Sequence, residues 1–178
     1  AVLLNNITIP ADMAWTPIGN ASTIYTGTFD GAGHTIDGMT IQSTGYYMGF
    51  VGYLYTNGVI QNLTLGENCS VSGSSKYVGG VCGYNNGGTI TGCTNHGTVN
   101  NTGTVCGCNN GTVTNSTHTG TVSGTGTYVG GICAYNRSGS TVTGCTNTGT
   151  VSGSSKYVGG VCGCNNGTVT NSTHTGTV

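Results

Sequence analysis

The chain has 178 residues, enough for one ordinary domain, but only 4% of them are charged and 35 are glycine. A typical globular domain carries ~25% charged residues, so a conventional globule is not expected. Three Lys or Arg side chains and a net charge of -1 exclude a basic nucleic-acid binder, because neutralising phosphates supplies most of that affinity. The low charge also excludes a charge-expanded disordered chain, and no apolar run approaches the ~18 residues of a membrane span.

Acidic side chains occur only in the first part of the chain, at Asp12, Asp30, Asp37 and Glu67. Calcium-type sites and acid–base pairs need several carboxylates, so the C-terminal hundred residues supply neither. The Asp-Gly and Gly-His pairs around Asp30 and His34 are typical of turns. We therefore predict no catalytic residue, no metal, no cofactor and no enzyme activity.

The N-terminal segment, residues 1–48, differs in composition from the rest of the chain. It contains both prolines, the only tryptophan, and the segments WTPIG at 15–19 and FDGAGHTI at 29–36. Terminal units of a stacked repeat protein are atypical because they close an exposed end. We expect residues 1–48 to form an N-terminal cap and the first irregular coils.

Residues 49–178 are built from repeats. The segment VCGCNNGTVTNSTHTGTV at 105–122 recurs unchanged at 161–178, and VSGSSKYVGGVCG at 71–83 recurs unchanged at 151–163. Short strand-like cores recur 24 to 31 residues apart, at Val51, Cys82, Cys106, Cys133 and Cys162. Two more columns of β-branched residues follow in Thr-rich runs: Ile36, Ile60, Ile90, Val113, Val142 and Val169, then Val99, Val122, Val151 and Val178.

Each unit therefore holds about three short strands, separated by Asn- and Gly-rich corners that tolerate positive φ angles. Units of 20–50 residues that bury little alone must stack on one another. We predict an all-β fold: a parallel β-solenoid of about five to six coils with an irregular N-terminal cap, in which copies lie ~4.8 Å apart. A propeller needs four strands in each ~40-residue blade and fits less well. The stack should continue beyond Val178, through more repeats of the same chain or by self-association end to end.

The repeats resemble those of GLUG-motif proteins, bacterial surface proteins whose units run approximately GGLVGYNxGxIxNCxxxGxV. The segments 79–85 (GGVCGYN) and 130–136 (GGICAYN) match this pattern, as do the positions that follow them, Ile90, Cys93, Gly97 and Val99, then Val142, Cys145, Gly149 and Val151. The two motifs of the N-terminal segment are similar to those that precede such repeats. The resemblance implies an exported parallel β-solenoid that serves as a stalk, an adhesin region or a companion of secreted enzymes such as IgA-cleaving peptidases. It supplies no catalytic residues.

Cysteine usage departs from that family, because cysteine replaces aliphatic residues at 82, 106, 133 and 162 and tyrosine at 108 and 164. Stacked copies would place cysteines ~4.8 Å apart, within the Cα range of a disulfide. We predict rung-to-rung disulfides such as Cys82–Cys106 and Cys133–Cys162; free thiols acting as small core side chains are the alternative, and Cys69 is the odd residue. The sequence does not choose among the pairings of Cys82, Cys93, Cys106, Cys108, Cys133, Cys145, Cys162 and Cys164.

Polar repeats supply two further predictions. His118 and His174 occupy the position of Asn95 and Asn147 in other coils, which indicates a polar corner ladder instead of a ligand set. T-x-T-x-T segments should place threonines on the outer face, in a flat grid with ~6.7 Å along the strand and ~4.8 Å between rungs. These threonines are Thr117, Thr119, Thr121, Thr146, Thr148, Thr150, Thr173, Thr175 and Thr177.

The function predicted from these features is structural. We expect an extracellular or cell-surface solenoid segment: a stalk, an adhesin region or a filament subunit. Its partners would be copies of itself, glycans or a host surface. An ice-binding protein that uses its outward Thr ladders is the alternative, although threonine is also a good strand former whose stacked hydroxyls bond to one another.

Overall fold

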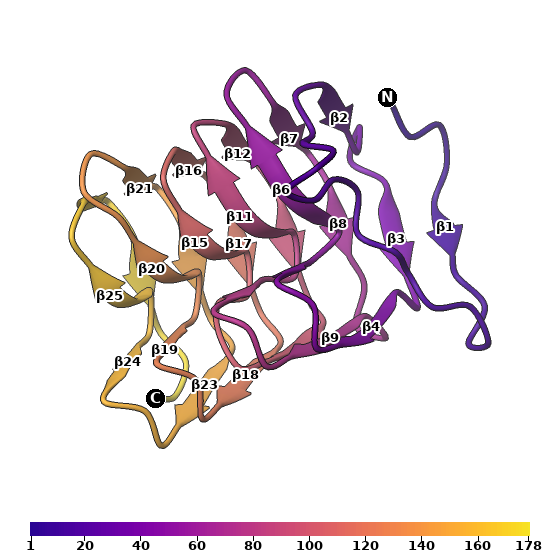
Figure 1. Cartoon of the computed structure of the whole chain (residues 1–178). Coiled ribbons are helices and arrows are strands. Elements are labelled where there is room, and N and C mark those ends of the chain that lie inside the picture. The colour runs from indigo at the N-terminus through magenta and orange to yellow at the C-terminus, as the bar shows by residue number, and fades with distance from the viewer.

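The computed structural model describes residues 1–178, and all of its regular elements are β-strands. The chain winds into a stack of coils from the indigo N-terminus to the yellow C-terminus (Figure 1). It contains no helix long and apolar enough to cross a membrane. The six-stranded sheet described next receives one strand from each of six coils, so the predicted β-solenoid is confirmed.

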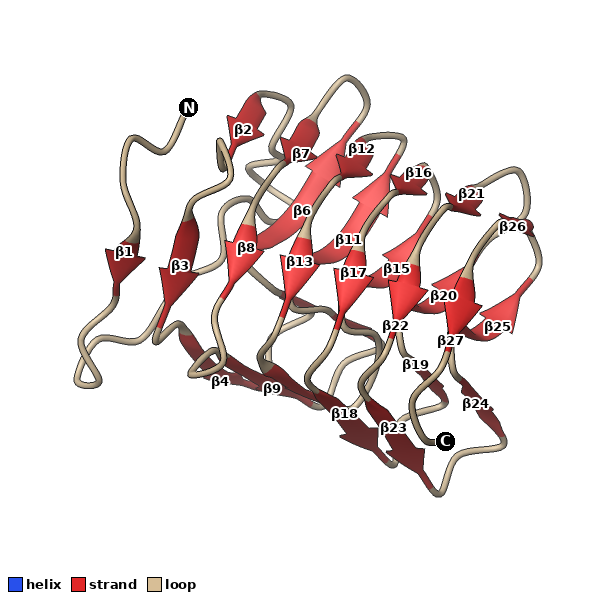
Figure 2. Cartoon of the chain, turned by 180° about the vertical axis from the view of Figure 1, so that it is seen from behind, coloured by secondary structure: helices blue, strands red, loops and turns tan.

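Four sheets, here named D, A, B and C in the order in which a coil visits them, run along the stack (Figure 2). Sheet D holds β6 (Val51–Tyr55), β11 (Cys82–Asn86), β15 (Cys106–Asn109), β20 (Cys133–Asn136) and β25 (Cys162–Asn165). Sheet A holds β2 (Thr28–Asp30), β7 (Val59–Gln61), β12 (Thr89–Thr91), β16 (Thr112–Thr114), β21 (Thr141–Thr143) and β26 (Thr168–Thr170).

Sheet B holds β1 (Ile7–Thr8), β3 (Thr35–Asp37), β8 (Thr64–Leu65), β13 (Thr94–Asn95), β17 (Thr117–His118), β22 (Thr146–Asn147) and β27 (Thr173–His174). Sheet C holds β4 (Thr40–Ser43), β9 (Ser70–Gly73), β14 (Thr98–Asn100), β18 (Thr121–Gly124) and β23 (Thr150–Gly153). Two short pairs lie between sheets C and D: β5 (Tyr47–Met48) with β10 (Tyr77–Val78), and β19 (Tyr128–Gly130) with β24 (Tyr157–Gly159).

The pairing is parallel and places equivalent residues of successive coils over one another. Val113 lies between Ile90 and Val142 in sheet A, and Val122 lies between Val99 and Val151 in sheet C, as the columns predict. The assignment of Ile36 to the column of Ile60 was wrong. Ile36 pairs with Leu65 in sheet B, and the residue that pairs with Ile60 in sheet A is Phe29. The aromatic Phe29 breaks the β-branched pattern by which the column was read.

Left-handed residues set the corner between sheets A and B. The residue that follows the sheet A strand has a positive φ of 53° at Asn62, 61° at Gly92, 49° at Asn115, 63° at Gly144 and 48° at Asn171. Only glycine and asparagine adopt this conformation readily. Their alternation in the sequence therefore fixes where each coil turns.

The core is a single narrow column of 29 buried hydrophobic residues, to which Val, Ile and Cys contribute most. At its N-terminal end, the Trp15 ring stacks on Phe50 with centroids 5.1 Å apart, and Trp15 Nε1 donates to the Phe50 carbonyl at 3.1 Å. Phe29 meets Phe50 edge-on at 4.7 Å. Regular stacking begins at β2, inside the segment expected to form the cap, and residues before it join the stack through β1 and isolated bridges.

Candidate functional site

The cysteine column of sheet D forms as the register predicts, but without disulfides. Cys106 is paired with Cys82 on one side and with Cys133 on the other, and Cys133 is paired with Cys162. All nine cysteines are free thiols, so the expected rung-to-rung bridges are not formed. Side chains in register on parallel strands keep their Cβ atoms ~4.8 Å apart, whereas a disulfide needs ~3.5–4.5 Å. The Cα spacing of aligned cysteines was therefore not sufficient to predict a disulfide.

Burial makes Cys82, Cys93, Cys108 and Cys133 unreactive. It raises the pKa of Cys82 and Cys133 well above the ordinary thiol value, and it raises the pKa of Cys93 and Cys108 to about 12. A thiol that stays protonated at neutral pH is a poor nucleophile and a poor metal ligand. No group of three His, Cys, Asp or Glu side chains lies close enough to hold a metal ion. Six of the nine cysteines belong to the buried core, where they serve as small apolar side chains.

The remaining cysteines lie at corners or on the outer side of sheet D. Cys93 and Cys145 follow the left-handed corner residues, and their Sγ atoms donate to carbonyls of the preceding coils, those of Ile60 and Val113, at 3.7 and 3.8 Å. Cys69 donates in the same way to the Ile36 carbonyl at 3.3 Å. Cys108 and Cys164 occupy a tyrosine column, which is described below.

The predicted threonines are outward but do not form one flat grid. Thr117, Thr146 and Thr173 lie in sheet B, whereas Thr121 and Thr150 lie in sheet C, because the chain turns between the two sheets. The corner positions between them, Thr119, Thr148 and Thr175, are exposed, and Thr177 follows the last strand. The alternation rule was applied across a corner, where it does not hold.

Sheet A carries a more regular threonine surface, which the sequence reasoning missed. Its T-x-T strands align Thr112 between Thr89 and Thr141, and Thr114 in the neighbouring column. The hydroxyls bond between coils, with Thr114 Oγ1 donating to Thr91 Oγ1 at 2.9 Å. The sequence contains the pattern that indicates this surface, since threonines flank the core residues as T-V-T and T-I-T. The complete columns are Thr89, Thr112, Thr141 and Thr168, and Thr91, Thr114, Thr143 and Thr170.

A ladder of asparagines, buried except at its last member Asn165, connects the coils from β11 to β25. Asn85 Nδ2 donates to Asn109 Oδ1 at 2.9 Å, Asn109 Nδ2 to Asn136 Oδ1 at 2.9 Å, and Asn136 Nδ2 to Asn165 Oδ1 at 2.8 Å. Asn85 Oδ1 also accepts from the Gly88 N–H at 2.9 Å, and Asn136 Oδ1 accepts from the Ser140 hydroxyl at 2.7 Å. Satisfied chains of this kind reinforce one another in a low dielectric, so the ladder stabilises the stack.

The predicted polar ladder at the other corner also forms, and it is buried except at His174 in the last coil. His118 is paired with Asn95 and Asn147, and Asn147 with His174. His118 Nδ1 lies 3.0 Å from the Asn95 carbonyl and donates to it, which leaves Nε2 buried without a partner. Burial lowers the pKa of His118 to about 4. The imidazole is therefore neutral at physiological pH.

Tyrosines form a row on the outer side of sheet D. The strand position of Tyr53 and Tyr84 continues as Cys108, Tyr135 and Cys164, and the short outer strands add a second column. Rings stack between the columns, with Tyr77–Tyr84 centroids 5.1 Å apart and Tyr128–Tyr135 centroids 5.0 Å apart. The second column comprises Tyr47, Tyr77, Tyr128 and Tyr157.

Comparison with known proteins agrees with the repeat architecture. The model of the GLUG motif matches residues 74–100 and 125–152. Halomucin of Haloquadratum walsbyi is 42% identical over 93 residues, which is 51% of this chain and 1% of halomucin. A Gly-rich protein of Evansella cellulosilytica, named as a candidate membrane protein, is 36% identical over 80 residues, 44% of this chain and 9% of its own length.

The fold is also found in a crystal structure. A candidate immunoglobulin A1 protease from Bacteroides ovatus superposes with a TM-score of 0.77 at 20% identity, over 98% of this chain and 60% of its own chain. The chain thus spans a small part of both sequence relatives and somewhat over half of this structural neighbour. The chain is thus a parallel β-solenoid that carries two matches to the GLUG motif.

Proposed function

We propose that this chain is a non-enzymatic structural or adhesive segment of a microbial protein that acts at the cell surface or outside the cell. The observation that carries the proposal is the in-register stacking of successive coils, which makes each coil a platform for the next. GLUG motifs and the likeness to halomucin and to a protein named for the membrane support the location.

Two of the four acidic side chains, Asp30 and Asp37, are engaged in hydrogen bonds to neighbouring residues, which supports a role without catalysis. Asp30 accepts hydrogen bonds from Gln61 Nε2 at 2.7 Å and from the Ala32 N–H at 2.8 Å. Asp37 accepts from Asn68 Nδ2 at 2.8 Å and from the Asn68 N–H at 3.0 Å. These bonds lower the pKa of Asp30 and Asp37, which keeps both carboxylates ionised as acceptors.

The location is tested with antibodies raised against the purified chain. Intact cells that produce the parent protein should be labelled, and brief external protease treatment should remove the label. Labelling that requires cell lysis would contradict the proposal. An antibody against a cytoplasmic protein of the same cells serves as the control for integrity.

The partner that we propose for the stack is another coil of the same kind, from the same chain or from a second copy. Val161, Cys162 and Val169 of the last coil pack on the core but stay half-buried, and β25, β26 and β27 each have one neighbouring strand. Sedimentation should show concentration-dependent association that Val169→Asp abolishes and the outward control Thr170→Asp preserves. Sedimentation of the wild-type chain that does not change with concentration would refute self-association, and association of Val169→Asp equal to that of the wild type would refute this surface.

The regular threonine surface of sheet A favours ice binding as a second candidate function. Its two columns present hydroxyl and methyl groups at fixed spacings of ~6.7 and ~4.8 Å. The purified chain should then shape ice crystals and produce thermal hysteresis, and Thr112→Tyr in the middle of one column should remove both. Ordinary ice growth at high protein concentration would eliminate this candidate.

A further inference from the structure

The tyrosine row on sheet D has one gap, at the coil that contains β15. In the strand column Cys108 replaces tyrosine, and before β15 the chain takes a shorter path: Cys82 and Cys106 are 24 residues apart, whereas the other copies are 27 to 31 apart. That coil contributes no outer-strand tyrosine. Rings therefore stack on each side of the gap, Tyr77 with Tyr84 and Tyr128 with Tyr135, but no ring pair crosses it.

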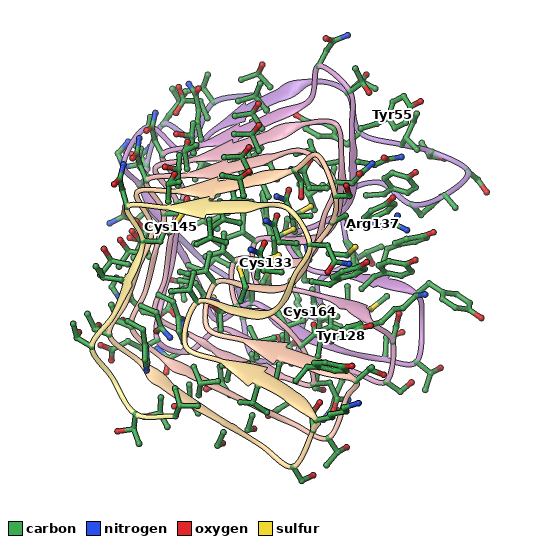
Figure 3. All side chains as sticks on the ribbon, turned by 90° about the vertical axis from the view of Figure 1, so that its left-hand side faces the viewer. Tyr55, Tyr128, Cys133, Arg137, Cys145 and Cys164 are labelled. Atoms are coloured by element: carbon green, nitrogen blue, oxygen red, sulfur yellow. The ribbon has the colours of Figure 1, made fainter.

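The gap is a hollow of suitable size for a single ring. It has a volume of about 90 Å³, and its flanking rings stand two rungs, ~9.6 Å, apart. The labelled Tyr128 and Arg137 lie on the tyrosine-bearing side of the stack (Figure 3). Six residues line the hollow: Lys76, Tyr77, Cys108, Tyr128, Tyr135 and Arg137. Cys108 is 3% exposed and its thiol is protonated, so it contributes a small uncharged side chain to the wall of the hollow.

Positive charge is concentrated at this hollow. Lys76 and Arg137 are two of the three cationic side chains in the chain, and no Asp or Glu follows Glu67 in the sequence. Arg137 Nη1 donates to Tyr84 Oη at 3.2 Å, and its guanidinium lies 5.9 Å from the Tyr135 ring centre. These contacts hold the guanidinium beside the gap and leave other N–H groups free for an anion.

We propose that this hollow binds an acidic sugar, a six-membered ring that carries a carboxylate. The C–H face of the ring packs against a tyrosine at the side of the gap, and the carboxylate accepts hydrogen bonds from Arg137 and Lys76. A neutral sugar lacks the group that the two cations would bind, and a small carboxylate lacks the ring that fills the gap. Charge-assisted bonds to guanidinium provide the stronger contribution.

The chain supplies matched controls for two residues of the site, Lys76 and Cys108. Lys156 repeats Lys76 within the identical segment VSGSSKYVGG, and it lies over Tyr157 at 5.3 Å as Lys76 lies over Tyr77 at 5.2 Å, but it does not line the hollow. Cys164 repeats Cys108 in the last coil. The pairs Lys76→Gln with Lys156→Gln, and Cys108→Tyr with Cys164→Tyr, therefore change the same chemistry inside and outside the hollow.

The test is an NMR titration of the whole chain with glucuronate, glucose, acetate and a nucleoside monophosphate. Glucuronate should shift amides around the hollow with millimolar affinity and bind at least about tenfold more tightly than glucose or acetate. Arg137→Gln should weaken binding about tenfold, Lys76→Gln severalfold and Lys156→Gln not at all. Cys108→Tyr should fill the gap and abolish binding, whereas Cys164→Tyr should leave it intact.

Three results would overturn the proposal: glucose or acetate binding as tightly as glucuronate, preferred binding of the nucleotide, or equal effects of Lys76→Gln and Lys156→Gln. The lysine pair decides the matter even if Cys108→Tyr does not fold, because both lysines are exposed. Binding by the purified chain is independent of the surface location proposed above. Either proposal can fail while the other stands.

Discussion

His118 provides a direct test of the buried polar column. Its pKa is about 4 in the folded chain and 6.5 when exposed, so the unfolded chain binds a proton over a pH range in which the folded chain does not. Stability must therefore fall as the pH drops from about 6.5 towards 4. Between pH 7 and pH 5 these two values correspond to a loss of about 2 kcal/mol, which equals ~1 M in the urea midpoint for a domain of this size.

The perturbation is His118→Asn, since asparagine occupies the same column at Asn95 and Asn147. Urea unfolding followed by far-ultraviolet circular dichroism at pH 7 and pH 5 should show that the variant loses about 2 kcal/mol less than the wild type over this interval. His96→Asn, on the outer side of the coil, should retain the wild-type loss. If His118→Asn is as acid-sensitive as the wild type, the burial argument is refuted.

Three more predictions follow from the packing. Asn109→Ala removes a central member of the asparagine ladder and leaves its partners unsatisfied, so urea unfolding should show a loss of about 3 kcal/mol, whereas Asn165→Ala at the end of the ladder should cost about 1 kcal/mol. Native alkylation with iodoacetamide, read by mass spectrometry, should modify the half-buried Cys164 and spare Cys106 until denaturant is added; equal labelling of the two would contradict the assigned burial. Trp15→Ala should cost about 2 kcal/mol because the stack on Phe50 is lost, and an unchanged urea midpoint would show that the N-terminal segment does not stabilise the coils.

Repetition made the fold predictable, because identical segments must occupy equivalent positions in a stack. The register of Cys82, Cys106 and Cys133 follows directly from their alignment in the sequence. The distances between side chains and the positions of the corners within a coil could not be predicted in the same way. Disulfides were predicted from Cα spacing alone, and the threonine grid was extended through the corner between Thr117 and Thr121.

The hollow beside Arg137 was missed for a different reason. Cysteine in place of tyrosine at Cys108 and the short spacing of that coil were both visible in the sequence. Neither residue pattern indicates a binding site until the outer strands place Tyr77 and Tyr128 on opposite sides of the gap. Such a site depends on the absence of a side chain from a column, whereas a sequence motif consists only of the residues that are present.

The asparagine ladder gives the stack a direction. Every side-chain amide in it donates towards the coil that follows, from Asn85 to Asn109, Asn136 and Asn165, so the amide dipoles add along the axis. The donor end of the ladder, Asn165, lies in the exposed last coil, whereas the acceptor end, Asn85, lies inside the stack beside β6, where Leu54 occupies the column. The ladder can therefore lengthen only from Asn165, and a coil added there continues it by presenting a side-chain acceptor to the amide donor of that residue.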